Sequence, residues 1–280
     1  MSEVLIVGGL TIDRFVNGRE APGGSVLHSG LTAVAEGATV TTLTVAGDEV
    51  VARDGVARLA SLGELALQPA PTTTTYRHEE RAGVRVLIFE ARTDQLDPAR
   101  LPRMSSPAVA LVAPIADEMA PSYVVALRAA VTPMRTVLLI QGWLRRLVIG
   151  EEVRALPLSQ LSEAQRSAIA SADAVVVSTE DLVESPGDPF GQATQLRGLC
   201  GPRPIIVVTL GQEGYVLDDP VRDRVVASIP RRVVTGVPAV GAGDAFGASL
   251  AVNLARGDDA TRAADRATER VITILEARRG

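Results

Sequence analysis

Short apolar runs alternate with longer amphipathic stretches along most of the chain. Five runs are apolar almost throughout: 4–7, 108–113, 136–140, 174–178 and 204–210. Strands buried on both faces of a sheet have this pattern. The stretches 25–36 and 117–130 carry apolar residues at helical spacing. The alternation predicts an α/β fold with a doubly wound, mostly parallel sheet flanked by helices.

Other segments are typical of antiparallel strands. Residues 72–76 and 84–89 are rich in β-branched and aromatic side chains and flank a charged turn at 78–83, which is the pattern of a hairpin. The runs 215–217 and 224–229 predict two strands that close the sheet near its C-terminal end. Ser162 and Gln165 have the spacing of a helix capping box.

A glycine turn at residues 241–243 leads directly into an apolar helix that ends at Gly257. The first amides of a helix lack intrahelical partners and the macrodipole adds positive potential, so this turn is suited to hold an anion. Asp244 lies at the same turn. Its carboxylate is either a helix N-cap or a base that accepts a proton from a hydroxyl attacking a phosphate.

Composition narrows the classes of function. The chain of 280 residues is 46% hydrophobic, which suffices for a substantial core in one large α/β domain or in two small ones. The net charge of −5, without a basic patch, argues against a nucleic-acid partner. No apolar run reaches the roughly 18 residues of a membrane span, and the N-terminus lacks a signal-peptide pattern. We therefore expect a cytoplasmic protein with no membrane partner.

All 28 basic residues are arginine. A Walker-A phosphate loop and a Schiff-base mechanism both need a lysine amine, so both are excluded. The single cysteine excludes an internal disulfide framework. The presence of only two histidines argues against a His-rich metal site or a Ser-His-Asp triad.

Residues 241–246, Gly-Ala-Gly-Asp-Ala-Phe, resemble the second signature of the ribokinase-like (phosphofructokinase-B type) sugar kinases. The resemblance implies that Gly241, Ala242 and Gly243 hold the transferring phosphate and that Asp244 is the catalytic base.

The segment from the first strand to the first helix resembles the other signature of that family. The resemblance implies that Asp13, Gly23 and Gly24 contact sugar hydroxyls, whereas a turn carboxylate is the alternative for Asp13. His28 stands where the family usually has Asn, so it is either a substrate contact or a structural histidine.

Three further matches follow in family order. Gln141-Gly-Trp-Leu-Arg145 is similar to an inositol-kinase-like branch, in which Arg145 would reach substrate or phosphate. A solvated arginine is the alternative. Ser178-Thr-Glu-Asp181 stands where the family organises magnesium with Asn-x-x-Glu, which leaves Asp181 and Glu180 as open choices for the metal, or as plain helix-start acids. The resemblance assigns nucleotide binding to four residues: Ser178, Thr209, Gly211 and Gly214.

The chain departs from the family at residues 238–240, which read Pro-Ala-Val in place of the usual Asp-Thr-Thr. Since that Asp often helps to bind a monovalent cation, activation by potassium is in doubt here.

The resemblance implies phosphorylation of a hydroxyl of a small sugar or polyol by ATP and Mg²⁺, with an inositol-like acceptor favoured. A nucleoside kinase of the same fold and a non-catalytic sugar- or nucleotide-binding relative remain as alternatives. The resemblance also implies a single kinase domain spanning 1–280, in which segments 13–22 and 72–91 are expected to form a β-sheet lid over the sugar. Exposed lid edges can pair between subunits, so a homodimer through the lid is a further expectation.

Overall fold

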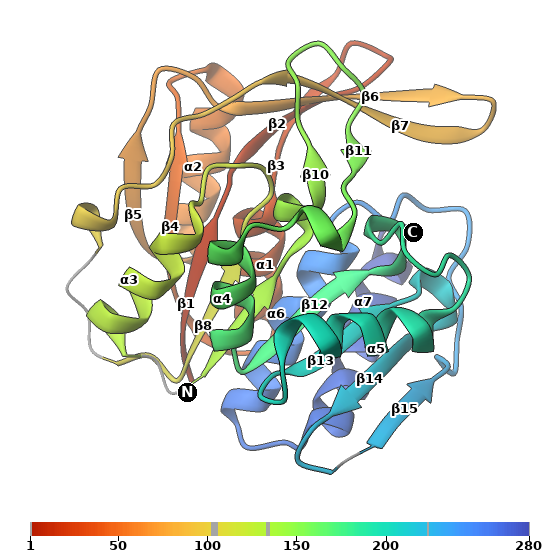
Figure 1. Ribbon diagram of the computed structural model, residues 1–280. Helices are drawn as coiled ribbons and strands as arrows, with labels where there is room; N and C mark the ends of the chain where they lie inside the picture. The colour runs from red at the N-terminus through yellow and green to blue at the C-terminus, as the bar shows by residue number, and fades with distance from the viewer. Residues whose placement is uncertain (1, 102–105, 133–134, 223, 280) are drawn as a thin grey trace.

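The computed structural model describes residues 2–101, 106–132, 135–222 and 224–279 (Figure 1). Its centre is a nine-stranded sheet. In spatial order the strands are β15 (Arg224–Ser228), β14 (Tyr215–Asp219), β13 (Ile205–Thr209), β12 (Ala174–Ser178), β9 (Thr136–Leu139), β8 (Val109–Ala113), β1 (Glu3–Gly8), β4 (Thr39–Ala46) and β5 (Gly63–Pro69).

Every neighbouring pair from β13 to β5 is parallel, whereas β14 and β15 are joined antiparallel at one end. The predicted mostly parallel sheet and its antiparallel closure are therefore confirmed. β5 was not predicted, because its alternating, half-exposed sequence lacks the apolar run of a central strand. It is an edge strand that pairs only with β4 among the described residues.

Helices cover both faces of the sheet (Figure 1). One face carries α1 (Ser25–Ala35), α2 (Val50–Leu62), α6 (Ala242–Ala255) and α7 (Ala260–Ala277). The other carries α3 (Pro121–Val131), α4 (Glu163–Ser171) and α5 (Pro189–Cys200). The described residues also contain five short 3₁₀ turns: η1 (Pro98–Arg100), η2 (Gln141–Leu144), η3 (Leu158–Gln160), η4 (Thr179–Asp181) and η5 (Gly211–Glu213).

Some predicted boundaries were wrong. The helix expected from residue 117 begins at Pro121, a residue favoured in the first helical turn because it has no amide hydrogen to leave unpaired. The capping box of Ser162 and Gln165 is confirmed at the start of α4. None of the helices in the described ranges combines the length and hydropathy needed to cross a membrane.

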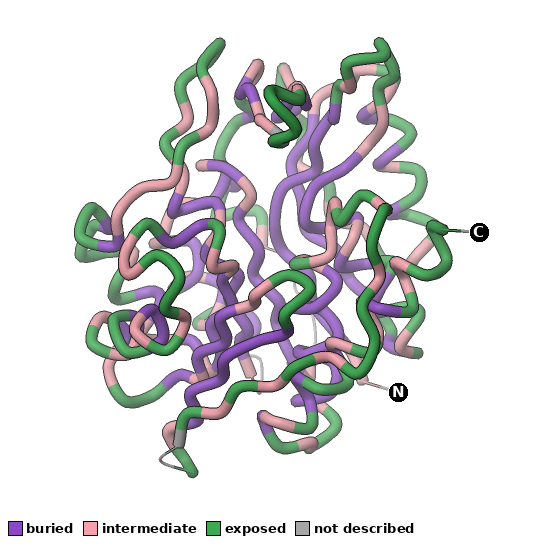
Figure 2. Tube along the Cα trace, turned by 90° about the vertical axis from the view of Figure 1, so that its right-hand side faces the viewer, coloured by how far each residue is buried: buried purple, intermediate pink, exposed green. Residues whose placement is uncertain are grey.

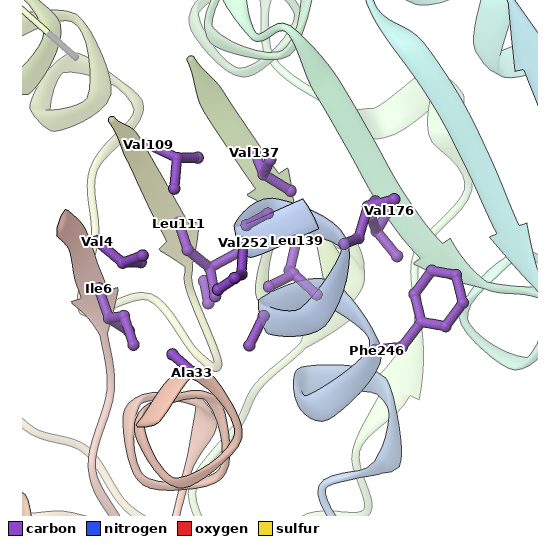
Figure 3. Close-up of a cluster of buried hydrophobic side chains, with 14 of the residues drawn as sticks. Val4, Ile6, Ala33, Val109, Leu111, Val137, Leu139, Val176, Phe246 and Val252 are labelled. Carbon is purple, nitrogen blue, oxygen red and sulfur yellow. The ribbon is translucent and has the colours of Figure 1, made fainter. Parts of the chain in front are cut away.

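Two layers of core follow from the alternation of side chains along each strand. In β1, Val4 and Ile6 face the layer that contains α1 and α6, and Leu5 and Val7 face the opposite layer. Figure 3 shows the first layer, in which side chains of the strands meet those of α1 and α6. Buried residues concentrate in the central strands, and the exposed ones lie on the outer helices and loops (Figure 2).

Helix α6 approaches the sheet closely because Gly247 has no side chain. A Cβ at this position would lie 2.6 Å from a methyl carbon of Leu139 in β9. The close approach places the N-terminus of α6 next to the ends of the central strands, where open α/β sheets bind their ligands.

A second, four-stranded sheet lies at the top of Figure 1. Its order is β3 (Glu20–Gly23), β2 (Thr11–Arg14), β6 (Thr74–Arg81) and β7 (Val84–Ala91). Both predicted lid segments therefore join one sheet. The hairpin turn is shorter than expected: strand pairing continues to Arg81 and Val84, which leaves Ala82 and Gly83 as the turn.

The outer edge of β7 is paired within the chain itself. The amide of Phe89 donates to Glu151 O (3.0 Å), and Leu87 O accepts from the Val153 amide (2.8 Å). The partners Glu151 and Val153 belong to the loop between the short strands β10 (Arg145–Arg146) and β11 (Arg154–Ala155). A homodimer through the lid remains a prediction.

Candidate active site

A cavity of about 860 Å³ opens where the central strands end beneath the lid. Residues from the lid, from β12 and β13, from the loop before α6 and from α7 line it. All of the site residues predicted from the sequence line this cavity except Gly23: Asp13, Gly24, His28, Arg145, Ser178, Glu180, Asp181, Thr209, Gly211, Gly214, Gly241, Ala242, Gly243 and Asp244.

Asp13 is a buried residue of β2 rather than a turn carboxylate. Its Oδ1 accepts a hydrogen bond from Thr11 Oγ1 (3.2 Å) and lies 3.4 Å from His78 Nε2 of lid strand β6. Gly23 packs against the same carboxylate, since a Cβ there would lie 2.3 Å from Asp13 Oδ2. Gly23 therefore makes room for Asp13 and does not itself line the cavity.

His78 was not predicted as a site residue, because a histidine in a polar turn carries no motif. The pairing of β2 with β6 brings it to Asp13. Its ring also stacks on Phe15, with ring centroids 4.8 Å apart. Both histidines of the chain, His28 and His78, thus line one cavity.

The glycine turn has the geometry expected of an anion-binding loop. Gly241 is the N-cap of α6 with φ of 75°, a left-handed conformation that favours glycine. Asp244 lies within the first turn and is not the N-cap, so the capping alternative was wrong. The Ala242 amide donates to Ala239 O (3.0 Å), so the unpaired amides that the helix offers in this turn are those of Gly243 and Asp244.

The Asp244 carboxyl is surrounded by other charged groups. Burial raises its pKa, an effect that the charges of His28 and Arg145 oppose and those of Asp13 and Asp181 reinforce. Ser29 Oγ of α1 donates to the Asp244 carbonyl (3.3 Å) and fixes the backbone at this position. A carboxylate with a raised pKa beside an anion-binding turn is suited to accept a proton.

Arg145 is not a solvated arginine: its side chain is 11% exposed and its Nη2 lies 3.5 Å from Asp181 Oδ1. The other oxygen of Asp181 accepts from Gln141 Nε2 (2.9 Å). Arg145, Asp181 and Gln141 therefore form one network on the cavity wall.

Glu180 is the exposed acid of the pair considered for magnesium. Within the described ranges, no group of three or more His, Cys, Asp or Glu side chains could hold a metal ion. Mg²⁺ commonly keeps several waters and binds through one or two carboxylates together with substrate phosphates. The donor set of Glu180 and Asp181 fits a magnesium ion that arrives with a phosphate ligand.

Ser178 and Thr209 lie at the ends of the neighbouring strands β12 and β13. The Ser178 side chain accepts from the Glu180 amide (3.2 Å) and the Thr209 hydroxyl donates to Val177 O (3.4 Å). Gly211 and Gly214 both have positive φ, and a Cβ at Gly214 would lie 1.9 Å from Ser228 O. These residues form one wall of the cavity beside the glycine turn.

An apolar wall of the cavity was not predicted. It is formed by the loop before α6 and by one side of α7: Val233, Val234, Val237, Val271, Ile272 and Leu275. The loop sequence has no periodic pattern, and nothing in the spacing of the α7 residues distinguishes the wall of a cavity from a packed helix face. Its apolar character suits a weakly polar part of a ligand.

Comparisons with known proteins bear on the fold of the chain. Residues 146–270 match the pfkB family of carbohydrate kinases. A pyrophosphate-dependent kinase in the ribokinase family, complexed with a pyrophosphate analogue and myo-inositol, has a TM-score of 0.77 at 16% identity, covering 95% of this chain and 92% of that one. Fructokinase from Vibrio cholerae O395 has a TM-score of 0.74 at 21% identity and covers 100% of both chains.

Aminoimidazole riboside kinase from Salmonella enterica, complexed with aminoimidazole riboside and an ATP analogue, has a TM-score of 0.70 at 17% identity, covering 96% of this chain and 92% of that one. No curated protein sequence matches the chain. The predicted resemblance to the ribokinase-like carbohydrate kinases is confirmed, and the chain has their fold along nearly its whole length.

Proposed function

We propose that this ribokinase-like chain transfers a phosphoryl group from Mg-ATP to a hydroxyl of a small polyol or sugar. One observation carries the proposal: Asp13 and the glycine turn with its adjoining Asp244 come from two distant segments of the chain and line a single cavity. One carboxylate near the lid can bind hydroxyls, and a second one, with a raised pKa, lies at the site for the phosphate.

Asp13 would accept hydrogen bonds from the acceptor hydroxyls, with its orientation fixed by Thr11 and His78. Asp244 would take the proton of the attacking hydroxyl. As it does so, the hydroxyl oxygen of the acceptor bonds to the γ-phosphorus of ATP, and the bond from that phosphorus to the β-phosphate oxygen breaks, which leaves ADP. The amides of Gly243 and Asp244 would stabilise the negative charge on the transferred group.

Glu180 and Asp181 would hold magnesium through its bound waters. The ion supplies charge neutralisation between the donor phosphates. Arg145 lies beside Asp181 and adds a permanent positive charge to the same wall.

Two features support ATP as the donor. The apolar wall that includes Val237 and Ile272 lines the same cavity as the glycine turn, and apolar side chains contribute nothing to binding pyrophosphate. Gly211 and Gly214, which the resemblance assigns to the nucleotide, line the same cavity. Pyrophosphate, the donor named for one of the similar kinases, is the competing outcome of the test.

The residues around Asp13 support a polyol acceptor. His28, His78, Gln141 and Arg145 line the same cavity as Asp13 and all carry polar side chains. A nucleoside base usually stacks on an aromatic surface, and only 3% of the residues of this chain are aromatic.

The test is phosphoryl transfer to a panel of inositols, sugars and nucleosides, with Mg-ATP or pyrophosphate as donor. We expect turnover with a polyol and ATP. Turnover only with pyrophosphate would replace the proposed donor, and turnover only with nucleosides would replace the acceptor. Ligand-induced thermal stabilisation without turnover under any condition would favour the non-catalytic binding protein.

A further inference from the structure

The side chain of Arg278, just beyond the end of α7, reaches the loop that leads into the glycine turn. Its Nη1 donates to two backbone carbonyls, Pro238 O and Val240 O, each at 2.9 Å. Both acceptors belong to the three residues that immediately precede Gly241. One guanidinium nitrogen therefore bridges two carbonyl oxygens next to the proposed phosphate site.

The direction of these carbonyls determines the direction of the neighbouring amides. In a trans peptide the C=O and the following N–H point to opposite sides, and the described residues contain no cis peptide. With Pro238 O and Val240 O held toward Arg278, the amides of Ala239 and Gly241 point away from it. The contact thus orients the backbone at the start of the turn.

The charge of Arg278 has a second effect. Carbonyl oxygens carry partial negative charge, and two of them that converge beside an anion site either repel the anion or attract a cation from solution. The guanidinium already supplies that cation from within the chain. Unlike a dissolved ion, it is present at all salt concentrations and is never deprotonated near neutral pH.

Stability alone does not explain the contact. Arg278 is exposed, and hydrogen bonds at exposed charged side chains contribute little to the free energy of unfolding. The same loop is already tied to α7 by Arg232, which pairs with Glu269 (3.2 Å) and Glu276 (3.0 Å).

We propose that Arg278 is a positioning residue: a built-in cation that fixes the loop 238–240 and so aligns the glycine turn for the donor phosphate, in place of a cation from solution. This inference rests on the proposed function, since it gives the turn the role of holding the transferred group.

The experiment compares Arg278→Ala with the wild type and with Arg279→Ala, which removes the neighbouring exposed arginine. We expect Arg278→Ala to lower kcat by about tenfold or more and to raise the KM of the donor, with little change in Tm. Millimolar guanidinium chloride should restore part of the loss, and Arg278→Lys should retain part of the activity. Arg279→Ala should behave like the wild type.

A second readout follows from the two carbonyls. Wild-type turnover should be the same in potassium and in tetramethylammonium salts, whereas Arg278→Ala should become faster with potassium, because a small cation can then bind between Pro238 O and Val240 O. Unchanged kinetics of Arg278→Ala would overturn the inference. So would a loss of activity that comes with a lower Tm and that neither guanidinium nor potassium restores.

Failure of the proposed function gives a different result. If the wild type transfers no phosphoryl group, the wild type and Arg278→Ala are compared by their affinity for pyrophosphate, measured by calorimetry, instead of by turnover. Weaker binding by Arg278→Ala that guanidinium restores supports the role of Arg278 at an anion site without catalysis. Equal affinities overturn it.

Discussion

The imidazole of His28 fills the space that a side chain at Gly241 would need. A Cβ built on Gly241 would lie 2.3 Å from His28 Cγ and 2.5 Å from both Cδ2 and Nδ1. His28 belongs to α1 and Gly241 begins α6, so the packing of these two helices places a ring directly on the glycine turn. The contact gives His28 a structural reason to be here, in addition to any contact with substrate.

Gly241→Ala is expected to reduce activity strongly, because it combines two defects. The left-handed backbone costs about 1 kcal/mol for a residue with a side chain, and the new methyl group collides with the His28 ring. The measurement is kcat together with the free energy of unfolding.

A double variant separates the two defects. In Gly241→Ala/His28→Ala the collision is gone and only the backbone cost remains, so unfolding free energy should partly recover relative to Gly241→Ala. Strictly additive effects of the two single changes would show that the ring and the turn do not interact.

His78→Leu is expected to raise the KM of the acceptor more than it lowers kcat. His78 lies against Asp13, which would bind the acceptor hydroxyls. His78 has no part in the proposed proton transfer to Asp244. An effect of about tenfold on KM matches the loss of one interaction with a charged group. His78→Gln, whose amide can still donate, serves as the matched control and should lie closer to the wild type. A change in kcat alone would contradict this role.

Ser162→Ala tests stability away from the site. The Ser162 side chain accepts from the Gln165 amide (3.2 Å) at the start of α4, and loss of such a cap costs about 1 kcal/mol. Tm should fall by about 2 °C with kinetics unchanged, as measured by calorimetry and initial rates. Ser171→Ala, at the other end of the same helix, should have a smaller effect, because its hydroxyl donates to Ala168 O without capping a free amide.

The sequence predicted most of the central sheet because buried strands such as β1 and β12 are continuous apolar runs. It also predicted the glycine turn and Asp13, since short motifs carry their own signal. It missed contacts that depend on tertiary packing. His78 reaches Asp13 only through the pairing of β2 with β6, and Arg278 reaches Pro238 only because α7 ends beside that loop.

The choice between Asp181 and Glu180 shows the same limit. Their spacing allowed either acid to hold magnesium, and the sequence had no means to separate them. The structure separates them by environment: Asp181 is buried and paired with Arg145 and Gln141, and Glu180 is exposed.

Asp244→Asn tests the proposed base through two independent measurements, turnover and the free energy of unfolding. Turnover should fall by about 100-fold to 10,000-fold, because an amide cannot accept the hydroxyl proton. The free energy of unfolding at neutral pH should increase. The pKa of Asp244 is raised above 3.8, mainly by burial, so the folded state binds its proton more tightly than the unfolded state does.

The carboxyl therefore opposes folding once it is charged: its stabilising protonated form is lost as pH rises from the ordinary aspartate range through the raised pKa. At neutral pH the uncharged Asn should increase the free energy of unfolding, and the gain should disappear in acid, where Asp244 is protonated too. Chemical denaturation at several pH values measures this difference. The control is Asp48→Asn, at a side chain that is 88% exposed, and it should show no such gain. An Asp244→Asn variant that keeps its activity would refute the assigned base, and one that is less stable at neutral pH would refute the burial argument.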